Sequence, residues 1–333
     1  MNAAGFWLLA AVFTVYAALD GYDLGVGAVH LWLARSNQER RVNLNAIGPV
    51  WNGNEVWLIA AGGLMVAVFP RLYAAAFSGF YLALMVVLWL LVLRGVAIEF
   101  RGQIVSELWA AFWDATFWIA SLLLTLALGV ALGNVVRGLP VGPDGYFLGS
   151  FTLMLNPYAM LVGALSLAVL AWHGLCFMRT KAEDAQHRRA QAWSGAAWWA
   201  AAALALAATV ATARLAPAML ANFWSHPAAL ALPALAVLGF AWGRSPRDRR
   251  AFAGSVLAIV GLLGSAAATV FPNLLRSTLN PGFSLTIYNA AAGAHGLRAA
   301  LIANGIALAA VGAYSSYVHG VFRGKVRLSQ HPY

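Results

Sequence analysis

Residues 6–33 read FWLLAAVFTVYAALDGYDLGVGAVHLWL, an apolar run that contains only two acidic side chains. A helix crosses the hydrocarbon core of a bilayer in about 20 residues, so this stretch is long enough to span a membrane. The rest of the chain has the same character, because 62% of its 333 residues are hydrophobic and 10% are charged. A soluble domain carries roughly one quarter charged residues. The composition therefore predicts a polytopic membrane protein and excludes an ordinary soluble fold.

Eight further apolar runs follow the first. Backbone groups in hydrocarbon must be satisfied within the segment, so each run is expected to be a helix. We predict an all-α polytopic membrane protein with about nine transmembrane helices, forming two four-helix bundles and one peripheral helix. It is a single integral membrane domain, 1–333, with the first bundle in 1–136, the second in 157–271 and the last helix at 297–320. The predicted spans are 6–33, 51–69, 73–98, 109–136, 157–178, 193–214, 223–242, 251–271 and 297–320.

The seventh run is interrupted by Pro227 and Pro233, which leaves an eight-span alternative open. Lysine and arginine distribution favours nine. Of the 21 basic residues, sixteen fall in one set of alternate connections, and the other set holds Arg71, Arg137, Arg214, Arg276 and Arg298. Short loops rich in Lys and Arg face the cytoplasm. The N-terminus is therefore expected outside and the C-terminus inside, and the net charge of +10 indicates orientation, not nucleic-acid binding.

Two acids of the first span, Asp20 and Asp23, are three residues apart and share one helix face. Ionisable groups in hydrocarbon are costly, and they usually face a bundle interior or a water-filled path. Gly21 and Gly25 beside them form a small-xxx-small pair that allows close helix packing. Two interpretations stay open: a proton path in which one acid holds a proton, or helix packing in which neighbours satisfy both acids.

The second span opens from the cytoplasmic side with WNGNEVWL at 51–58. Glu55 enters the membrane there at a depth that can meet the two acids of the first span. Glu55 can equally be a first-turn acid that complements the helix dipole. Trp51 and Trp57 can form an interfacial aromatic belt.

A group of charges closes the third span and begins the fourth. Arg94, Glu99 and Arg101 lie at the expected cytoplasmic edge, and Asp114 follows among tryptophans. Snorkelling and ion pairing at the membrane surface are the expected roles of such residues. We predict a charge cluster of Arg94, Arg101 and Asp114 at this edge, with Asp114 at the interface.

Histidine content bears on cofactors, because a membrane haem needs axial His or Met ligands. Only His173 lies clearly within a span, and His30 and His319 are expected to be solvated near the cytoplasmic surface. The single cysteine, Cys176, excludes an internal disulfide and thiolate metal sites. We therefore predict that this chain binds no metal and no haem of its own.

Five sequence blocks carry a family resemblance: DGYDLGVG at 20–27, WNGNEVWL at 51–58, AAAFSGFY at 74–81, R-x-x-x-x-EFR at 94–101 and SLTIYNA at 284–290. Together they resemble subunit II of the cytochrome bd-type quinol oxidases, including the cyanide-insensitive branch. The first three blocks are long and specific. The spans between 180 and 270 match in hydropathy alone.

The resemblance implies a terminal oxidase of the bacterial inner membrane that oxidises quinol and reduces dioxygen to water. Haems b and d and quinol oxidation would belong to a haem-bearing subunit I, so this chain would be inactive alone. Membrane lipid is a further expected partner, with a small single-span subunit and a structural quinone in some members, and no nucleic acid. The resemblance places a cytoplasmic proton path at Asp20, Asp23, Asn52, Glu55 and Glu99, and a subunit contact or oxygen route at Gly21, Gly25, Trp51 and Trp57.

One departure concerns that path. Some members have Asp where Asn52 stands and Gln where Glu55 stands, so the carboxylate is shifted by about one helical turn. We expect Glu55 to take the place of the missing acid.

Two other functions use similar residues. A proton-coupled transporter also needs intramembrane carboxylates, but it would act as an isolated chain and usually carries charges in both halves. The last four predicted spans, from residue 193 onward, contain no acid. A structural scaffold would use the acids for packing alone.

Overall fold

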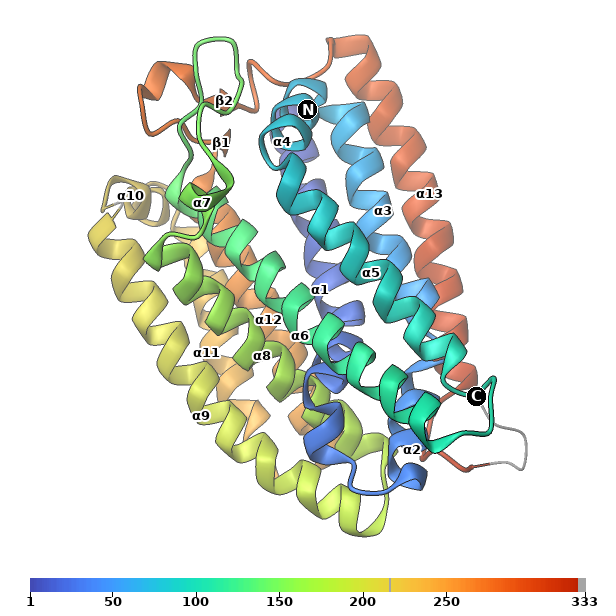
Figure 1. Cartoon of the computed structure of the whole chain (residues 1–333). Helices are drawn as coiled ribbons and strands as arrows, with labels where there is room; N and C mark the ends of the chain where they lie inside the picture. Colours follow the sequence, from blue (N-terminus) through green and yellow to red (C-terminus); the bar gives the residue numbers. More distant parts are fainter. Residues whose placement is uncertain (216, 329–333) are drawn as a thin grey trace.

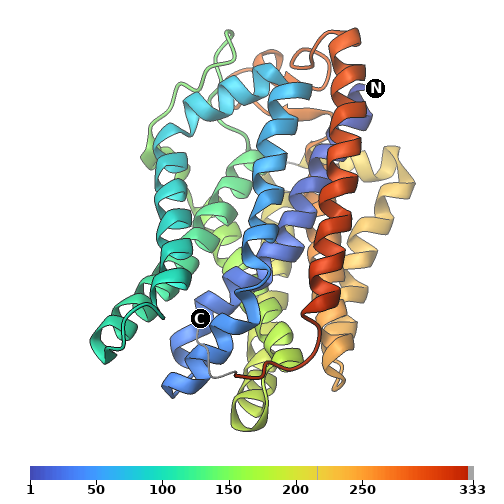
Figure 2. The same cartoon turned by 90° about the vertical axis from the view of Figure 1, so that its right-hand side faces the viewer.

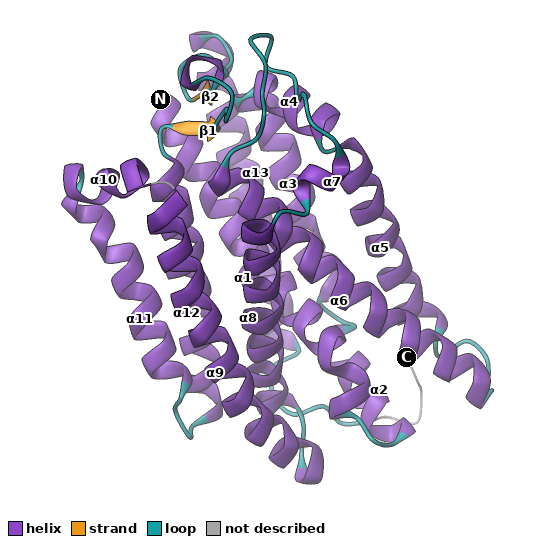
Figure 3. Cartoon of the chain, turned by 60° about the vertical axis from the view of Figure 1, so that its left-hand side comes forward, coloured by secondary structure: helices purple, strands orange, loops and turns teal. Residues whose placement is uncertain are grey.

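The computed structural model describes residues 1–215 and 217–328 as one elongated bundle of helices, with a short strand pair at one end (Figures 1 and 3). The helices are α1 Asn2–Leu33, α2 Asn37–Ile47, α3 Trp51–Val68, α4 Pro70–Gly79, α5 Tyr81–Phe100, α6 Glu107–Arg137, α7 Phe151–Met154, α8 Pro157–Lys181, α9 Asp184–Leu215, α10 Pro217–Ser225, α11 Ala231–Gly243, α12 Asp248–Val270 and α13 Ala294–Val321. Two 3-10 turns, η1 Pro227–Leu230 and η2 Pro281–Phe283, and the strands β1 Asn273–Leu275 and β2 Leu285–Thr286 complete the described elements.

Seven helices in the described part of the chain are long and apolar enough to cross a membrane. They are α1, α5, α6, α8, α9, α12 and α13, and they confirm an all-α polytopic membrane protein. The other two predicted spans fall outside this set. The first turns of α3 carry Asn52, Asn54 and Glu55, which lower its apolar character. The predicted span 223–242 is divided, because α10 ends at Ser225 and a 3-10 turn beginning at Pro227 precedes α11.

The predicted third span, 73–98, begins later than expected. Pro70 starts α4, a separate helix that ends at Gly79, and α5 begins at Tyr81. Proline suits the first turn of a helix because its missing N–H has no partner there. Figure 2 shows α4 lying across the end of the bundle between α3 and α5.

The centre of the bundle is α1, which packs against α3, α6, α8 and α12. A Cβ atom on Gly25 would lie 1.9 Å from the carbonyl oxygen of Leu170, and one on Gly21 would lie 2.9 Å from the Leu170 side chain. These two glycines therefore serve contact between α1 and α8 of the same chain, in contrast to the predicted contact with a second subunit. The peripheral α13 packs against α3.

The two ends of the bundle are built differently. At one end, β1 pairs antiparallel with β2, and the Leu139 backbone N–H donates to the carbonyl of Arg276. The opposite end holds α2 and the α5–α6, α8–α9 and α11–α12 connections (Figure 1). We call it the α2 end. Asn2 bonds Ile287 at the β1–β2 end, and Val326 bonds Lys181 at the α2 end. Asn2 and Val326 therefore lie at opposite ends of the bundle.

Candidate functional site

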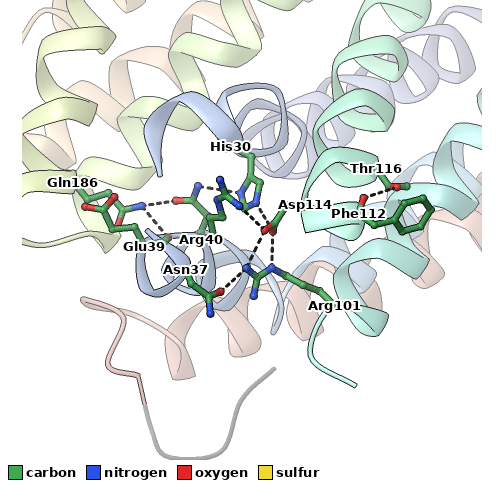
Figure 4. A network of polar contacts seen from close by, with 10 residues as sticks. His30, Asn37, Glu39, Arg40, Arg101, Phe112, Asp114, Thr116 and Gln186 are labelled. Atoms are coloured by element: carbon green, nitrogen blue, oxygen red, sulfur yellow. Dashed lines mark hydrogen bonds and ion pairs between the residues drawn. The ribbon is translucent and has the colours of Figure 1, made fainter. Parts of the chain in front are cut away.

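Asp114 of α6 is the centre of one buried network near the α2 end (Figure 4). Its Oδ1 accepts from Arg101 Nε at 2.5 Å and lies 2.9 Å from His30 Nε2, and its Oδ2 accepts from Arg101 at 2.9 Å and from Arg40 at 3.2 Å. The side chains of Asp114 and His30 are fully buried. We call Asp114, His30, Arg40 and Arg101 the Asp114 cluster. It ties together α1, α2, α5 and α6.

The hydrogen bonds around this cluster fix the tautomer of His30. Gln186 Nε2 donates to the backbone carbonyl of Glu39 at 3.1 Å and to Asn43 Oδ1 at 2.7 Å. A carbonyl can only accept, so the Gln186 amide is oriented, and the Asn43 amide with it. Asn43 then donates through Nδ2 to His30 Nδ1 at 3.1 Å. The ring proton is therefore on Nε2, where it is donated to Asp114.

A second buried group lies deeper in the bundle around Arg94 of α5. One guanidinium nitrogen, Nη2, donates to Asp20 Oδ1 at 2.7 Å and to Glu55 Oε2 at 3.3 Å. Arg94 and Asp20 are fully buried, and the Glu55 side chain is 19% exposed. We call Arg94, Asp20 and Glu55 the Arg94 cluster. It joins α1, α3 and α5.

Asp23 lies beside this cluster and is also fully buried. Its Oδ2 accepts from Asn54 Nδ2 at 2.7 Å, and the same nitrogen donates to the Tyr22 hydroxyl at 2.8 Å. The Tyr22 hydroxyl in turn lies 2.7 Å from His319 Nε2 of α13. A continuous line of hydrogen bonds therefore runs from Asp23 to the last helix.

Several polar atoms in this deeper region are buried and make no hydrogen bond to any residue that the structure describes. They are Arg94 Nε and Nη1, Asp20 Oδ2, Asp23 Oδ1, Asn54 Oδ1 and the Tyr16 hydroxyl. Buried polar atoms are normally paired with protein groups or ordered water, because an unpaired one costs about 1–3 kcal/mol. The unpaired atoms of the deeper region are therefore candidate positions for ordered water.

The predicted charge cluster of Arg94, Arg101 and Asp114 is wrong for Arg94. Arg94 lies seven residues before Arg101, or about 10 Å deeper along α5, and it pairs with Asp20 while Arg101 pairs with Asp114. The expected solvation of His30 is also wrong, since His30 is fully buried, as is Asp114. The partners that compensate the burial of Asp114 are His30, Arg40 and Arg101, which lie on α1, on α2 and at the end of α5. Their positions in the sequence do not show that they meet Asp114.

The residues of the predicted proton path are only partly brought together. Asp20 and Glu55 share Arg94, and Asp23 lies next to them through Asn54. The side chains of Asn52 and Glu99 are exposed, and no hydrogen bond in the described chain links either to these acids.

The two tryptophans predicted as a contact or oxygen route are held within the chain. Trp57 is 7% exposed and donates weakly to Ser315 Oγ at 3.4 Å. Trp51 is half-buried, and its ring lies 3.1 Å from where a Cβ on Gly95 would stand.

Sequence reasoning missed Asn54, Tyr22 and the bonded role of His319. A signal for Asn54 existed, because the buried positions of α3 are Asn54, Trp57, Ala61, Leu64, Met65 and Val68. This i, i+3, i+4 spacing marks one helix face. Asn54 shares that face and Asn52 does not, so periodicity groups Asn54 with the apolar residues of α3, while the direction of the face is set by packing. Tyr22 and His319 carry no comparable local signal.

Both ring nitrogens of the membrane histidine His173 are in contact with protein atoms. Nε2 lies 3.0 Å from the carbonyl oxygen of Ala18, and Nδ1 lies 2.8 Å from Ser255 Oγ. Within residues 1–215 and 217–328, no group of three or more His, Cys, Asp or Glu side chains is placed to hold a metal ion.

The fold and the site define an all-α polytopic membrane protein whose ionisable side chains are paired inside its helix bundle. Residues 1–322 match the family described as cytochrome bd terminal oxidase subunit II. The chain therefore belongs to the cytochrome bd terminal oxidase subunit II family, and it is a subunit of an oxidoreductase complex.

Individual relatives agree with the family. The chain is 31% identical over 319 residues to "Cytochrome bd-I ubiquinol oxidase subunit 2" of Escherichia coli (strain K12), covering 85% of this chain and 84% of that protein. It is 31% identical over 322 residues to "Cytochrome bd ubiquinol oxidase subunit 2" of Bacillus subtilis (strain 168), covering 96% and 95%. A chain of the bd oxidase from Geobacillus thermodenitrificans superimposes with a TM-score of 0.79 at 19% identity, over 96% of this chain and 98% of that one. That likeness supports the fold.

Proposed function

We propose that this chain is the haem-free subunit II of a bd-type quinol oxidase in the bacterial inner membrane, and that it supplies a cytoplasmic proton path. It acts with a haem-bearing subunit I, which carries haems b and d and oxidises quinol while dioxygen is reduced to water. The names of the relatives and the five sequence blocks support this assignment. The same resemblance makes a small single-span subunit, a structural quinone and bound lipid further candidates for the complex.

The topology that accompanies this proposal has nine spans, with α3 and α11 crossing the membrane beside the seven longer helices. Both run along the bundle in parallel with their neighbours (Figures 1 and 3). The α2 end faces the cytoplasm, because fifteen of the 21 basic residues lie in or next to the connections at that end.

The observation that carries the proton path is the charge balance of the deeper region. Two acids, Asp20 and Glu55, pair with one buried cation, Arg94, and a third acid, Asp23, is buried beside them. If all three were ionised, two negative charges would remain uncompensated inside the bundle, and burial of unpaired charge is strongly unfavourable. Protons are the simplest compensation, and the unpaired atoms Asp23 Oδ1 and Arg94 Nε offer sites for the water that delivers them.

Glu55 is the outermost acid of the group, because its side chain alone among the three is partly exposed. Protons from the cytoplasmic side are therefore taken up at Glu55 and pass to Asp20 and Asp23. Arg94 holds Asp20 and Glu55 in place and sets how many protons the group retains.

The haem-free assignment is supported by the histidines. Both ring nitrogens of His30 and of His173 already make hydrogen bonds within the chain, so neither is free to bind an iron atom.

The test uses the complete oxidase, purified and reconstituted into vesicles. We expect Asp23→Asn and Glu55→Gln to lower quinol oxidase turnover by roughly tenfold or more, since a positioned proton-transfer group typically contributes 10²–10⁴-fold. The haem spectrum and the subunit masses should be unchanged. Asp144→Asn, in the α6–α7 connection at the opposite end, is the matched control. Wild-type turnover in both site variants would refute the path, and loss of assembly would favour the scaffold interpretation.

A further inference from the structure

A cavity of about 430 Å³ opens at the α2 end, between α8, α12 and the last turn of α13. Its lining includes His319, the rings of Phe177 and Phe252, and the cations Lys181, Arg249 and Arg323. His319 is the member of this lining that is hydrogen-bonded to the line leading to Asp23. It therefore stands between a solvent-accessible space and a fully buried acid.

The hydrogen bonds of His319 fix the direction of that line. Its Nδ1 lies 2.7 Å from the backbone carbonyl of Ser315, which can only accept, so Nδ1 carries the proton of the neutral ring. Nε2 is then an acceptor, and the Tyr22 hydroxyl donates to it at 2.7 Å. The Tyr22 oxygen accepts from Asn54, which also donates to Asp23. With neutral His319, Asn54 thus turns its N–H groups toward Asp23.

Protonation of His319 at Nε2 is incompatible with this arrangement. Both ring nitrogens then donate, so the Tyr22 oxygen accepts from His319 and its own proton needs a new acceptor. Asn54 Oδ1 is buried and has no partner among the described residues. A half-turn of the Asn54 amide brings Oδ1 toward Tyr22 and Asp23, and places an acceptor where Asp23 now receives an N–H. This half-turn gives up the weak 3.4 Å bond from Asn54 Nδ2 to the Leu19 carbonyl.

An acceptor in that position can bond Asp23 only if Asp23 carries a proton. We propose that His319 couples the proton concentration in the cavity to the protonation of Asp23, through reversal of the Tyr22 and Asn54 hydrogen bonds. One proton passes from water to His319 Nε2, the Tyr22 O–H rotates without breaking, and the proton for Asp23 arrives by way of Glu55. His319 is a positioning residue in this scheme, which rests on the proposed proton path.

The groups that face His319 come from each element packed around it. Tyr22 lies on α1, Lys181 on α8, Arg249 on α12 and Arg323 just after α13. No titratable side chain of α3 is hydrogen-bonded to His319, because Glu55 of α3 is paired with Arg94. The three cations oppose a further positive charge on the ring, but water in the open cavity screens them.

The experiment measures quinol oxidase turnover of the reconstituted complex between about pH 6 and pH 8.5, the range that brackets histidine titration. Wild-type turnover should fall as pH rises through this range. His319→Gln should remove the slope and hold turnover at the alkaline level, roughly tenfold below wild type at the acid end. Tyr22→Phe should do the same, and the double variant should lose no more than either single variant. His295→Gln, at the other end of the same helix, should keep the wild-type profile.

Asp23→Asn in the same assay separates the two proposals. If Asp23→Asn and Glu55→Gln both leave turnover unchanged, the proton path itself is refuted. If Asp23→Asn lowers turnover while His319→Gln and Tyr22→Phe keep the wild-type slope, the path survives and the coupling by His319 is overturned. Haem content verifies assembly of each variant, and Tyr22→Phe serves alone if His319→Gln does not assemble.

Discussion

The Asp114 cluster and the Arg94 cluster contain the same kinds of side chain and differ in how completely they are satisfied. Both carboxylate oxygens of Asp114 are bonded, and His30 uses both of its ring nitrogens. In this cluster Arg40 Nε is buried without a partner among the described residues. In the deeper region, Arg94 leaves two nitrogens unpaired and Asp23 leaves one oxygen unpaired. A satisfied network rigidifies a fold, whereas a buried polar group without a partner is costly unless water pairs with it. The Asp114 cluster therefore joins helices, and the less satisfied deeper region is the one in which we propose proton transfer.

The largest effect expected from this difference concerns stability. Asp114→Asn leaves Arg101 buried without its counter-charge, and breaking a buried pair in this way costs about 3–5 kcal/mol. We expect a marked drop in the thermal unfolding midpoint of the purified complex, with loss of assembled haem-bearing oxidase. An unchanged midpoint would contradict the clamp role of the Asp114 cluster.

A smaller loss of stability is expected for Asp20→Asn, because Arg94 keeps Glu55 as a counter-charge. The lost charge-assisted hydrogen bond is worth about 1.5–3 kcal/mol, and the complex should still assemble. The same thermal assay, run beside Asp114→Asn, tests the comparison directly. Equal destabilisation by the two variants would mean that both clusters are structural.

A pH effect is expected where the Asp114 cluster meets the surface at Glu39. Burial raises the pKa of Glu39, but hydrogen bonds from Arg189 and from the Arg35 backbone outweigh it and hold the pKa below the usual value. A lowered pKa contributes stability above the unfolded-state value near 4.3, and this contribution is lost as the pH falls through the folded-state value. Its size is at most about 1 kcal/mol for a pair near the surface. Glu39→Gln should lower the unfolding midpoint at neutral pH and leave it unchanged near pH 3. If Glu39→Gln changes the unfolding midpoint more near pH 3 than at neutral pH, the predicted direction of the pH effect is wrong.

The smallest effects are expected for Glu99→Gln and Asn52→Ala. Both side chains are exposed and lie outside the two clusters, and such substitutions usually change stability by less than about 0.5 kcal/mol. Turnover of the reconstituted oxidase should match wild type at every pH tested. A clear loss of turnover with Glu99→Gln would return Glu99 to the proton path and extend that path beyond the Arg94 cluster.

Much of the architecture could be predicted from residue order alone. Apolar length predicted helices at 109–136, 157–178 and 297–320, and the structure has α6, α8 and α13 there. The break at 223–242 was less accessible, because proline is tolerated inside some membrane helices and ends others, depending on the neighbours. Pro70 poses the same problem: it starts the separate helix α4, so the third span begins later than the sequence predicted.

The candidate site was predictable by residue type and less so by partner. Asp20, Asp23 and Glu55 were identified because acids are rare in apolar spans. Arg94 was assigned to the membrane edge because sequence distance from Arg101 does not say which residues of other helices lie alongside. Only the tertiary structure shows that Asp20 of α1 and Glu55 of α3 both contact Arg94 of α5.

The sequence by itself determined the class of protein, the approximate spans and the segments that carry buried charge, because hydrophobic length and the scarcity of acids are properties of the chain. The tertiary structure decided which charges are paired, that Asn54 and not Asn52 points inward, and that His319 of α13 bonds Tyr22 of α1. Helix periodicity defines a face but not the rotation of that face toward a neighbour. That rotation depends on contacts such as the glycine-mediated approach of α1 to α8, which join residues far apart in the chain.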